Sequence, residues 1–166
     1  MTHLSVPLPL EAEIGQRLLA RKLSLSVAES CTGGLIASRL TDVPGSSAYF
    51  IGGVVAYAYE VKERILGVSH HTLYDHGAVS EPTAREMAHG VRRALGTDIG
   101  VSVTGIAGPG GGLPGKPVGL TWIALSARDA DQAREFTWSG TRTANKAQSA
   151  EAALRLLLDY LDGLSR

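Results

Sequence analysis

Residues 27–34 constrain the fold most strongly, because they connect a predicted strand to a predicted helix and carry several reactive side chains. An apolar, β-favouring run at 23–28 stops abruptly, and the apolar spacing of 35–40 is that of a helix. Between them stand Ser30, Cys31, Thr32, Gly33 and Gly34. Backbone N–H groups at such a junction lack partners and the helix dipole is positive, which suits an oxyanion or a phosphate. The same residues equally suit a helix cap.

Strand-like and helix-like segments alternate along the chain. We predict helices at 10–22, 31–40, 60–66, 82–95 and 141–161, and strands at 23–28, 51–59, 98–104, 118–126 and 133–138. Residues 42–47 form a turn cluster, and 68–77 are irregular or helical in pieces. The last two strands predict an antiparallel hairpin. The pattern therefore indicates an α/β fold with a mixed sheet of about five strands, in one domain over residues 1–166.

Composition narrows the class of protein. Lys and Arg number 16 and Asp and Glu number 16 in 166 residues, so no basic field predicts binding to nucleic acid or to an anionic membrane. Cys31 is the single cysteine, which excludes an intramolecular disulfide and suits a reducing compartment. We find neither a signal-peptide pattern nor an apolar run that spans a bilayer, and expect a cytoplasmic protein.

Three chemically active segments follow predicted strands, at 29–34, 57–62 and 104–112. In α/β sheets ligands gather at the carboxyl ends of strands, so these segments are expected to share one site. Ser30, Ser47 and Lys62 then suggest a serine–lysine dyad. A lysine acts as a base near neutral pH only when it is desolvated or near another cation. From composition alone, an ordinary surface lysine is the better interpretation of Lys62.

Two further features are candidates for binding anions. The glycine-rich loop at 105–112 suits a phosphate cradle or a flexible surface loop, and it matches neither a Walker motif nor a dinucleotide fingerprint. Arg142 lies just inside the N-terminus of the last predicted helix and is either an anion ligand or a solvated charge. The histidines form no metal-ligand motif, so we expect no metal.

Several separate blocks of the sequence, in order, resemble the CinA C-terminal domain family. They are residues 28–34, 45–47, 53–57 with Lys62, 66–68, 77–82, 104–109 and 116–119. The resemblance implies a three-layer α/β/α sandwich. It also implies that the chain is similar to stand-alone nicotinamide-nucleotide amidases, which hydrolyse the carboxamide of nicotinamide mononucleotide (NMN) to nicotinate mononucleotide and ammonia. Many relatives carry this domain behind a larger N-terminal domain.

The resemblance also implies the site residues. The catalytic set would be Ser30, Ser47, Tyr57, Lys62 and Thr104. The substrate-binding set would be Cys31, Thr32, Gly33, Gly34, Gly105, Gly108, Gly110, Gly111 and Arg142. Ser30 is the favoured nucleophile because of its junction, and Ser47 is its rival if the turn at 45–47 folds back beside Lys62. We expect no cofactor, a small pyridine nucleotide as substrate, and a homo-oligomer built on the apolar faces of the first and last helices.

Two other functions fit the same residues. In one, Cys31 is the nucleophile of the amidase, with Glu29 and Lys62 as partners, because a thiol at a helix N-terminus can have a lowered pKa. In the other, the chain is a nucleotide-binding or regulatory module without turnover. Direct DNA binding is the weakest option because the net charge is zero.

Overall fold

Five strands form one mixed sheet in the order β2-β1-β3-β4-β5. The computed structural model describes residues 7–164. The strands are β1 (Leu25–Glu29), β2 (Phe50–Val55), β3 (Ile99–Gly105), β4 (Leu120–Ser126) and β5 (Asp131–Thr137). β1 runs parallel to β2 and β3, whereas β3–β4 and β4–β5 are antiparallel. The predicted mixed sheet with a closing hairpin is confirmed.

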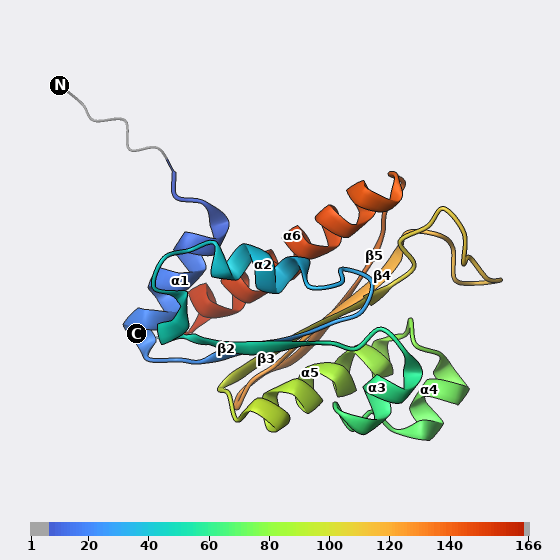
Figure 1. The fold of residues 1–166 in the computed structure, drawn as a ribbon, viewed down its shortest axis with the longest axis horizontal. Helices are drawn as coiled ribbons and strands as arrows, with labels where there is room; N and C mark the ends of the chain where they lie inside the picture. Colours follow the sequence, from blue (N-terminus) through green and yellow to red (C-terminus); the bar gives the residue numbers. More distant parts are fainter. Residues whose placement is uncertain (1–6, 165–166) are drawn as a thin grey trace.

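Helices cover both faces of the sheet (Figure 1). They are α1 (Leu10–Arg21), α2 (Leu35–Thr41), α3 (Tyr59–Arg64), α4 (His70–His76), α5 (Glu81–Leu95) and α6 (Arg142–Gly163), with a 3-10 turn at Ser46–Ala48. Figure 1 shows α1, α2 and α6 on one face and α3, α4 and α5 on the other. The expected three-layer α/β/α sandwich is therefore correct. Among residues 7–164, no helix combines the length and apolarity needed to span a bilayer.

The core lies on both sides of the central strands. β1 is buried along its whole length and β3 along nearly all of it, as expected for strands covered by helices on both faces. One apolar cluster joins these strands to α1, α2 and α6, and a smaller one lies under α3, α4 and α5. β5 is an edge strand and has only exposed and half-buried residues. The two helical layers thus hold the parallel strands rigidly in place.

Local signals explain where several elements begin and end. α5 starts at a Ser80 cap, whose hydroxyl accepts the N–H of Thr83, and it ends at Gly96 in the left-handed conformation. β2 keeps a glycine because a Cβ at Gly53 would lie 2.8 Å from Cγ2 of Val27, closer than real Cβ atoms come. The glycine pair that weakens β2 as a sequence pattern therefore permits close packing in the fold.

Two predicted boundaries are wrong, and both adjoin the site. The helix predicted from residue 31 begins at Leu35, because residues 30–34 form a turn that is held by the Glu29 side chain. The strand predicted to reach residue 59 ends at Val55, where the chain turns and α3 begins at Tyr59. Both errors arise from hydrogen bonds that apolar periodicity does not reveal.

Candidate active site

The carboxyl ends of three parallel strands meet at one edge of the sheet. Glu29, the last residue of β1, pairs with Val55 on one side and Val103 on the other. Ser30 continues this pairing, since its N–H donates to the Val103 carbonyl at 2.9 Å. The N–H of Ala56 donates to the Glu29 carbonyl at 2.8 Å. The three segments that the sequence places after strands are thereby brought together.

Lys62 and Ser30 form a hydrogen-bonded pair at this edge. Nζ of Lys62 lies 3.0 Å from Oγ of Ser30, 2.7 Å from the Ala56 carbonyl oxygen and 3.3 Å from that of Tyr57. Lys62 is only 1% exposed, although it is carried by the short surface helix α3. Burial lowers the pKa of this amine from its ordinary 10.5 to about 8. The surface-lysine interpretation is therefore wrong.

The geometry around Nζ sets the direction of proton transfer. An uncharged amine has two N–H donors and one lone pair. As a charged ammonium, Lys62 donates to Oγ of Ser30 and to the carbonyl oxygens of Ala56 and Tyr57. Once it is uncharged, its two N–H groups can stay on the two carbonyl oxygens, and its lone pair then faces the Ser30 hydroxyl. Neutral Lys62 is thus oriented to accept the serine proton. This arrangement can perform general-base activation of an alcohol.

A cleft of about 220 Å³ opens onto this pair. Its walls come from the ends of β1 and β3, from the segment after β2, from the start of α6 and from the segment before α5. The lining residues are Ser30, Cys31, Tyr57, Lys62, Ala78, Val79, Thr104, Gly105, Ala107 and Arg142. Among the predicted site residues, the cleft therefore collects Ser30, Cys31, Tyr57, Lys62, Thr104, Gly105 and Arg142.

Tyr57 and Arg142 close one side of the cleft. The Arg142 guanidinium donates to the Gly108 carbonyl at 2.8 Å and to the Tyr57 hydroxyl at 3.1 Å. Tyr57 is 60% exposed and its phenol accepts from Arg142, whereas of Tyr57 only the carbonyl accepts from Lys62. Tyr57 therefore positions an arginine at the mouth of the cleft, and its phenol contacts Arg142 and not Lys62.

Thr104 is buried at the end of β3, and its hydroxyl donates to the Ala78 carbonyl at 2.7 Å. This bond ties the segment before α5 to the end of the sheet and shapes the cleft wall. Gly105, the next residue, has no room for a side chain, since a Cβ there would lie 2.6 Å from the Thr121 hydroxyl and 3.1 Å from Sγ of Cys31. Thr104 and Gly105 thus determine the shape of the site.

The turn after β1 is organised by the buried carboxylate of Glu29. It accepts hydrogen bonds from the Thr32 hydroxyl at 2.5 Å and from the N–H groups of Gly34, Ile36 and Ala37 at 2.9–3.1 Å. These donors are therefore occupied, and Thr32, Gly33 and Gly34 do not line the cleft. Of the four turn residues predicted to bind substrate, only Cys31 lines the cleft.

Two amides of the turn, those of Cys31 and Thr32, donate to no carbonyl or carboxylate within residues 7–164. The Cys31 N–H also faces its own thiol sulfur. The Cys31 amide directly follows Ser30, which is the position that supplies an oxyanion donor when a serine attacks from a strand-to-helix turn. The Cys31 side chain is only 6% exposed, and burial raises the pKa of its thiol to about 11. This opposes the thiolate that a cysteine mechanism requires.

Ser47 lies at the opposite end of the sheet. It belongs to the 3-10 turn Ser46–Ala48 that precedes β2, whereas Lys62 follows that strand. Six extended residues span about 20 Å, so the turn does not fold back beside Lys62. Ser47 is solvent-exposed and Ser46 beside it is buried. Only Ser30 of the two candidate serines is within reach of the lysine.

The glycine-rich loop contributes less than its sequence predicts. Gly105 lines the cleft, and the Gly108 carbonyl holds Arg142. Gly110 and Gly111 are exposed and do not line the cleft. They belong to a loop that projects beyond the sheet edge before β4 (Figure 1). The surface-loop interpretation thus holds for Gly110 and Gly111.

Sequence reasoning missed several residues that shape the site. The sequence suggests Glu29 only as a partner for Cys31, yet its carboxylate caps the turn. Buried Asn145 donates to the Ala107 carbonyl at 3.1 Å and fastens the cleft wall to α6. Lys146, the next residue, lies near Gly33. The spacing of Asn145 and Lys146 in the sequence could have indicated them, because both follow Arg142 within about one turn of the same helix.

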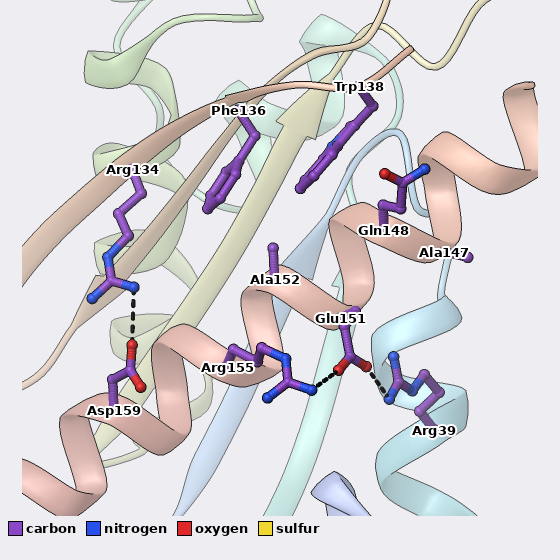
Figure 2. A pocket seen from close by; sticks show the side chains of 10 residues that line it. All are labelled: Arg39, Arg134, Phe136, Trp138, Ala147, Gln148, Glu151, Ala152, Arg155 and Asp159. Atoms are coloured by element: carbon purple, nitrogen blue, oxygen red, sulfur yellow. Dashed lines mark hydrogen bonds and ion pairs between the residues drawn. The ribbon is translucent and has the colours of Figure 1, made fainter. Parts of the chain in front are cut away.

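A larger groove of about 640 Å³ lies between α6 and β5 (Figure 2). Phe136 and Trp138 stack against each other on its wall, with ring centroids 5.0 Å apart. Its arginines are already paired with acids, as Arg39–Glu151, Arg155–Glu151 and Arg134–Asp159. The lining residues include no nucleophile with a base beside it. The smaller cleft is therefore the candidate active site.

The fold and the cleft define an α/β/α protein with a buried serine–lysine pair at the carboxyl ends of its parallel strands. Residues 8–161 match the model of the CinA C-terminal domain. The chain is 52% identical to a CinA-like protein of Chlorobium limicola over 157 residues, and 52% identical to a putative competence-damage inducible protein of Desulforamulus reducens over 154. These matches cover 92–93% of this chain but only 37% of either relative.

Solved structures are similar over nearly their whole length. The competence damage-inducible protein A of Klebsiella pneumoniae superposes with a TM-score of 0.91 at 36% identity, covering 94% of this chain and 97% of that one. A competence/damage inducible protein of Agrobacterium tumefaciens gives 0.85 at 40% identity, covering 96% and 99%. The chain belongs to the CinA C-terminal domain family.

Proposed function

We propose that this chain is an amidase that hydrolyses the carboxamide of NMN, with Ser30 as nucleophile and Lys62 as base. The observation that carries the proposal is the 3.0 Å contact between the buried Lys62 amine and the Ser30 hydroxyl in an open cleft. The choice of NMN rests on the family resemblance of the sequence. Arg142, whose charge lines the cleft, suits a phosphorylated substrate.

The first half of the reaction forms an acyl-enzyme. Neutral Lys62 takes the proton of the Ser30 hydroxyl, and the oxygen forms a bond to the carboxamide carbon. The Cys31 and Thr32 amides stabilise the oxyanion, and one such donor is worth about 3–4 kcal/mol of the barrier. The carbon–nitrogen bond then breaks, and protonated Lys62 gives its proton to the departing nitrogen. Ammonia leaves, and an ester joins the nicotinoyl group to Ser30.

The second half releases the product. Lys62 is uncharged again after ammonia has formed, and it takes a proton from a water molecule. The resulting hydroxide attacks the ester carbon, and the Ser30 oxygen leaves with the proton returned by Lys62. Nicotinate mononucleotide is the product. The same amine thus acts as base and acid in turn, which suits a group whose pKa is about 8.

Arg142 supports binding in this scheme. Its guanidinium is fixed by the Gly108 carbonyl and by the Tyr57 hydroxyl, so its charge stands at the cleft without free rotation of the side chain. A substrate phosphate at this mouth would gain from that charge. The relatives are named as competence-damage inducible proteins, and those names specify no chemistry.

Ammonia release from NMN by the purified chain tests the proposal, with Lys62→Met as the matched inactive variant. We expect release by the wild-type chain and none above background by the variant. Calorimetry with NMN runs in parallel. Binding without ammonia would support the nucleotide-binding module instead, and turnover by Lys62→Met close to wild type would remove Lys62 from the mechanism.

A further inference from the structure

Lys146 is a second cation beside the turn that carries Ser30, and the proposed mechanism does not use it. It lies four residues after Arg142 on α6, about 6 Å further along the axis and on the same side of the helix. Its Nζ sits beside Gly33, where a Cβ added to the glycine would be only 3.8 Å away. Gly33 is in the left-handed conformation, with φ at +64°, and a Cβ there would make an ordinary van der Waals contact with the ammonium.

The charge of Lys146 reaches the reactive end of the cleft. Burial is the main cause that raises the pKa of the Cys31 thiol, and the ammonium groups of Lys62 and Lys146 oppose this rise. Cys31 lines the cleft next to Ser30. Lys146 is therefore close enough to act on a bound anion, although the sequence, which is neutral overall, predicts no basic site.

The N–H groups of the Lys146 ammonium also have no hydrogen-bond partner among residues 7–164. Arg142 has two of its guanidinium nitrogens occupied by Gly108 and Tyr57. Glu29, the acid beside this turn, is saturated by four donors. In the described part of the chain, Lys146 makes neither a hydrogen bond nor an ion pair. A cation in this state, one turn from a fixed arginine, suits a doubly charged oxyanion that bridges the two.

We propose that Lys146, beside Gly33, binds the phosphate of the substrate and makes the site select a phosphomonoester over the corresponding nucleoside. The inference rests on the proposed function for the identity of the pyridine ring of the substrate. Recognition of the phosphate depends only on its charge. Arg142 orients the phosphate from a fixed position, and Lys146 supplies the ammonium that has no other partner. The specificity of the site is thereby carried by α6, opposite the catalytic pair.

Binding of ribose 5-phosphate, measured by calorimetry with ribose as the reference, tests this without any turnover. Lys146→Gln should raise the Kd by about tenfold or more, the usual scale for the loss of one charge-assisted contact. Lys146→Arg should restore most of the affinity. Arg155→Gln is the matched control, because it removes a positive charge from α6 in the groove with Phe136. It should leave the Kd unchanged.

Turnover gives the second readout. With NMN, Lys146→Gln should raise KM by about tenfold at nearly constant kcat, whereas KM for nicotinamide riboside should not change. An equal loss for both substrates, an unchanged Kd for ribose 5-phosphate, or no binding of it by the wild-type chain would overturn the inference. Absence of ammonia release from NMN would refute the proposed function alone, since ribose 5-phosphate binding still decides the role of Lys146.

Discussion

Replacing Lys62 by Met should remove a pH dependence from the stability of the protein. The pKa of Lys62 is about 8 in the folded chain and 10.5 in its ordinary environment. Between these values the unfolded chain binds more protons than the folded chain, so the free energy of unfolding rises with pH. The stabilisation is complete above the higher value and is lost as the pH falls through about 8. Met cannot titrate and lacks this contribution.

The size of the effect follows from the two pKa values. A pKa difference of one corresponds to 1.36 kcal/mol, so between about pH 7 and about pH 9.5 the wild-type chain should gain about 2 kcal/mol relative to Lys62→Met. Met fills a similar volume but leaves the Ala56 carbonyl without its donor. That loss is the same at every pH, so it displaces the two stability curves without changing their difference in slope.

Urea denaturation of both proteins across this pH range measures the difference directly. Subtracting the variant from the wild type cancels the other titrating groups. Lys22→Met, at an exposed lysine, is the control and should follow the wild-type slope. A wild-type and a Lys62→Met curve that stay parallel would show that the amine has an ordinary pKa, and the base assignment would then fail.

Two other substitutions separate the groups around the nucleophile. Cys31→Ala should keep ammonia release within about threefold of wild type, because a buried thiol whose pKa is raised to about 11 supplies no thiolate; collapse of activity would favour the cysteine mechanism. Glu29→Gln should lower the free energy of unfolding by about 2 kcal/mol or more, because an amide cannot accept all four hydrogen bonds of the carboxylate; an unchanged urea midpoint would contradict its role in the turn.

Apolar periodicity predicted the order of the elements well. The mixed sheet, the hairpin β4–β5 and the Ser80 and Gly96 ends of α5 follow from local patterns, because each is set by residues adjacent in sequence. The same patterns misplaced the start of α2 and the end of β2. Those boundaries depend on the Glu29 side chain and on carbonyls that turn toward Lys62, and no periodicity records such contacts.

The candidate site was predictable in outline for a similar reason. Strand order puts the segments after β1, β2 and β3 at one edge, so Ser30, Lys62 and Thr104 were expected together. Ser47 was misplaced because it lies in the turn before β2, whereas Lys62 lies after that strand. The two residues are therefore at opposite ends of β2. Lys146 has no motif of its own; its spacing places it one turn after Arg142, and the packing of α6 against the turn brings its ammonium beside Gly33.

Ammonia release from NMN by Ser30→Ala and Ser47→Ala, with mass spectrometry of the quenched enzyme, tests the Ser30–Lys62 pair most directly. We predict that Ser30→Ala loses at least about 1,000-fold in kcat and carries no adduct, while Ser47→Ala stays close to wild type. An active Ser30→Ala enzyme that retains a nicotinoyl adduct, alongside an inactive Ser47→Ala enzyme, would contradict the pairing of Ser30 with Lys62.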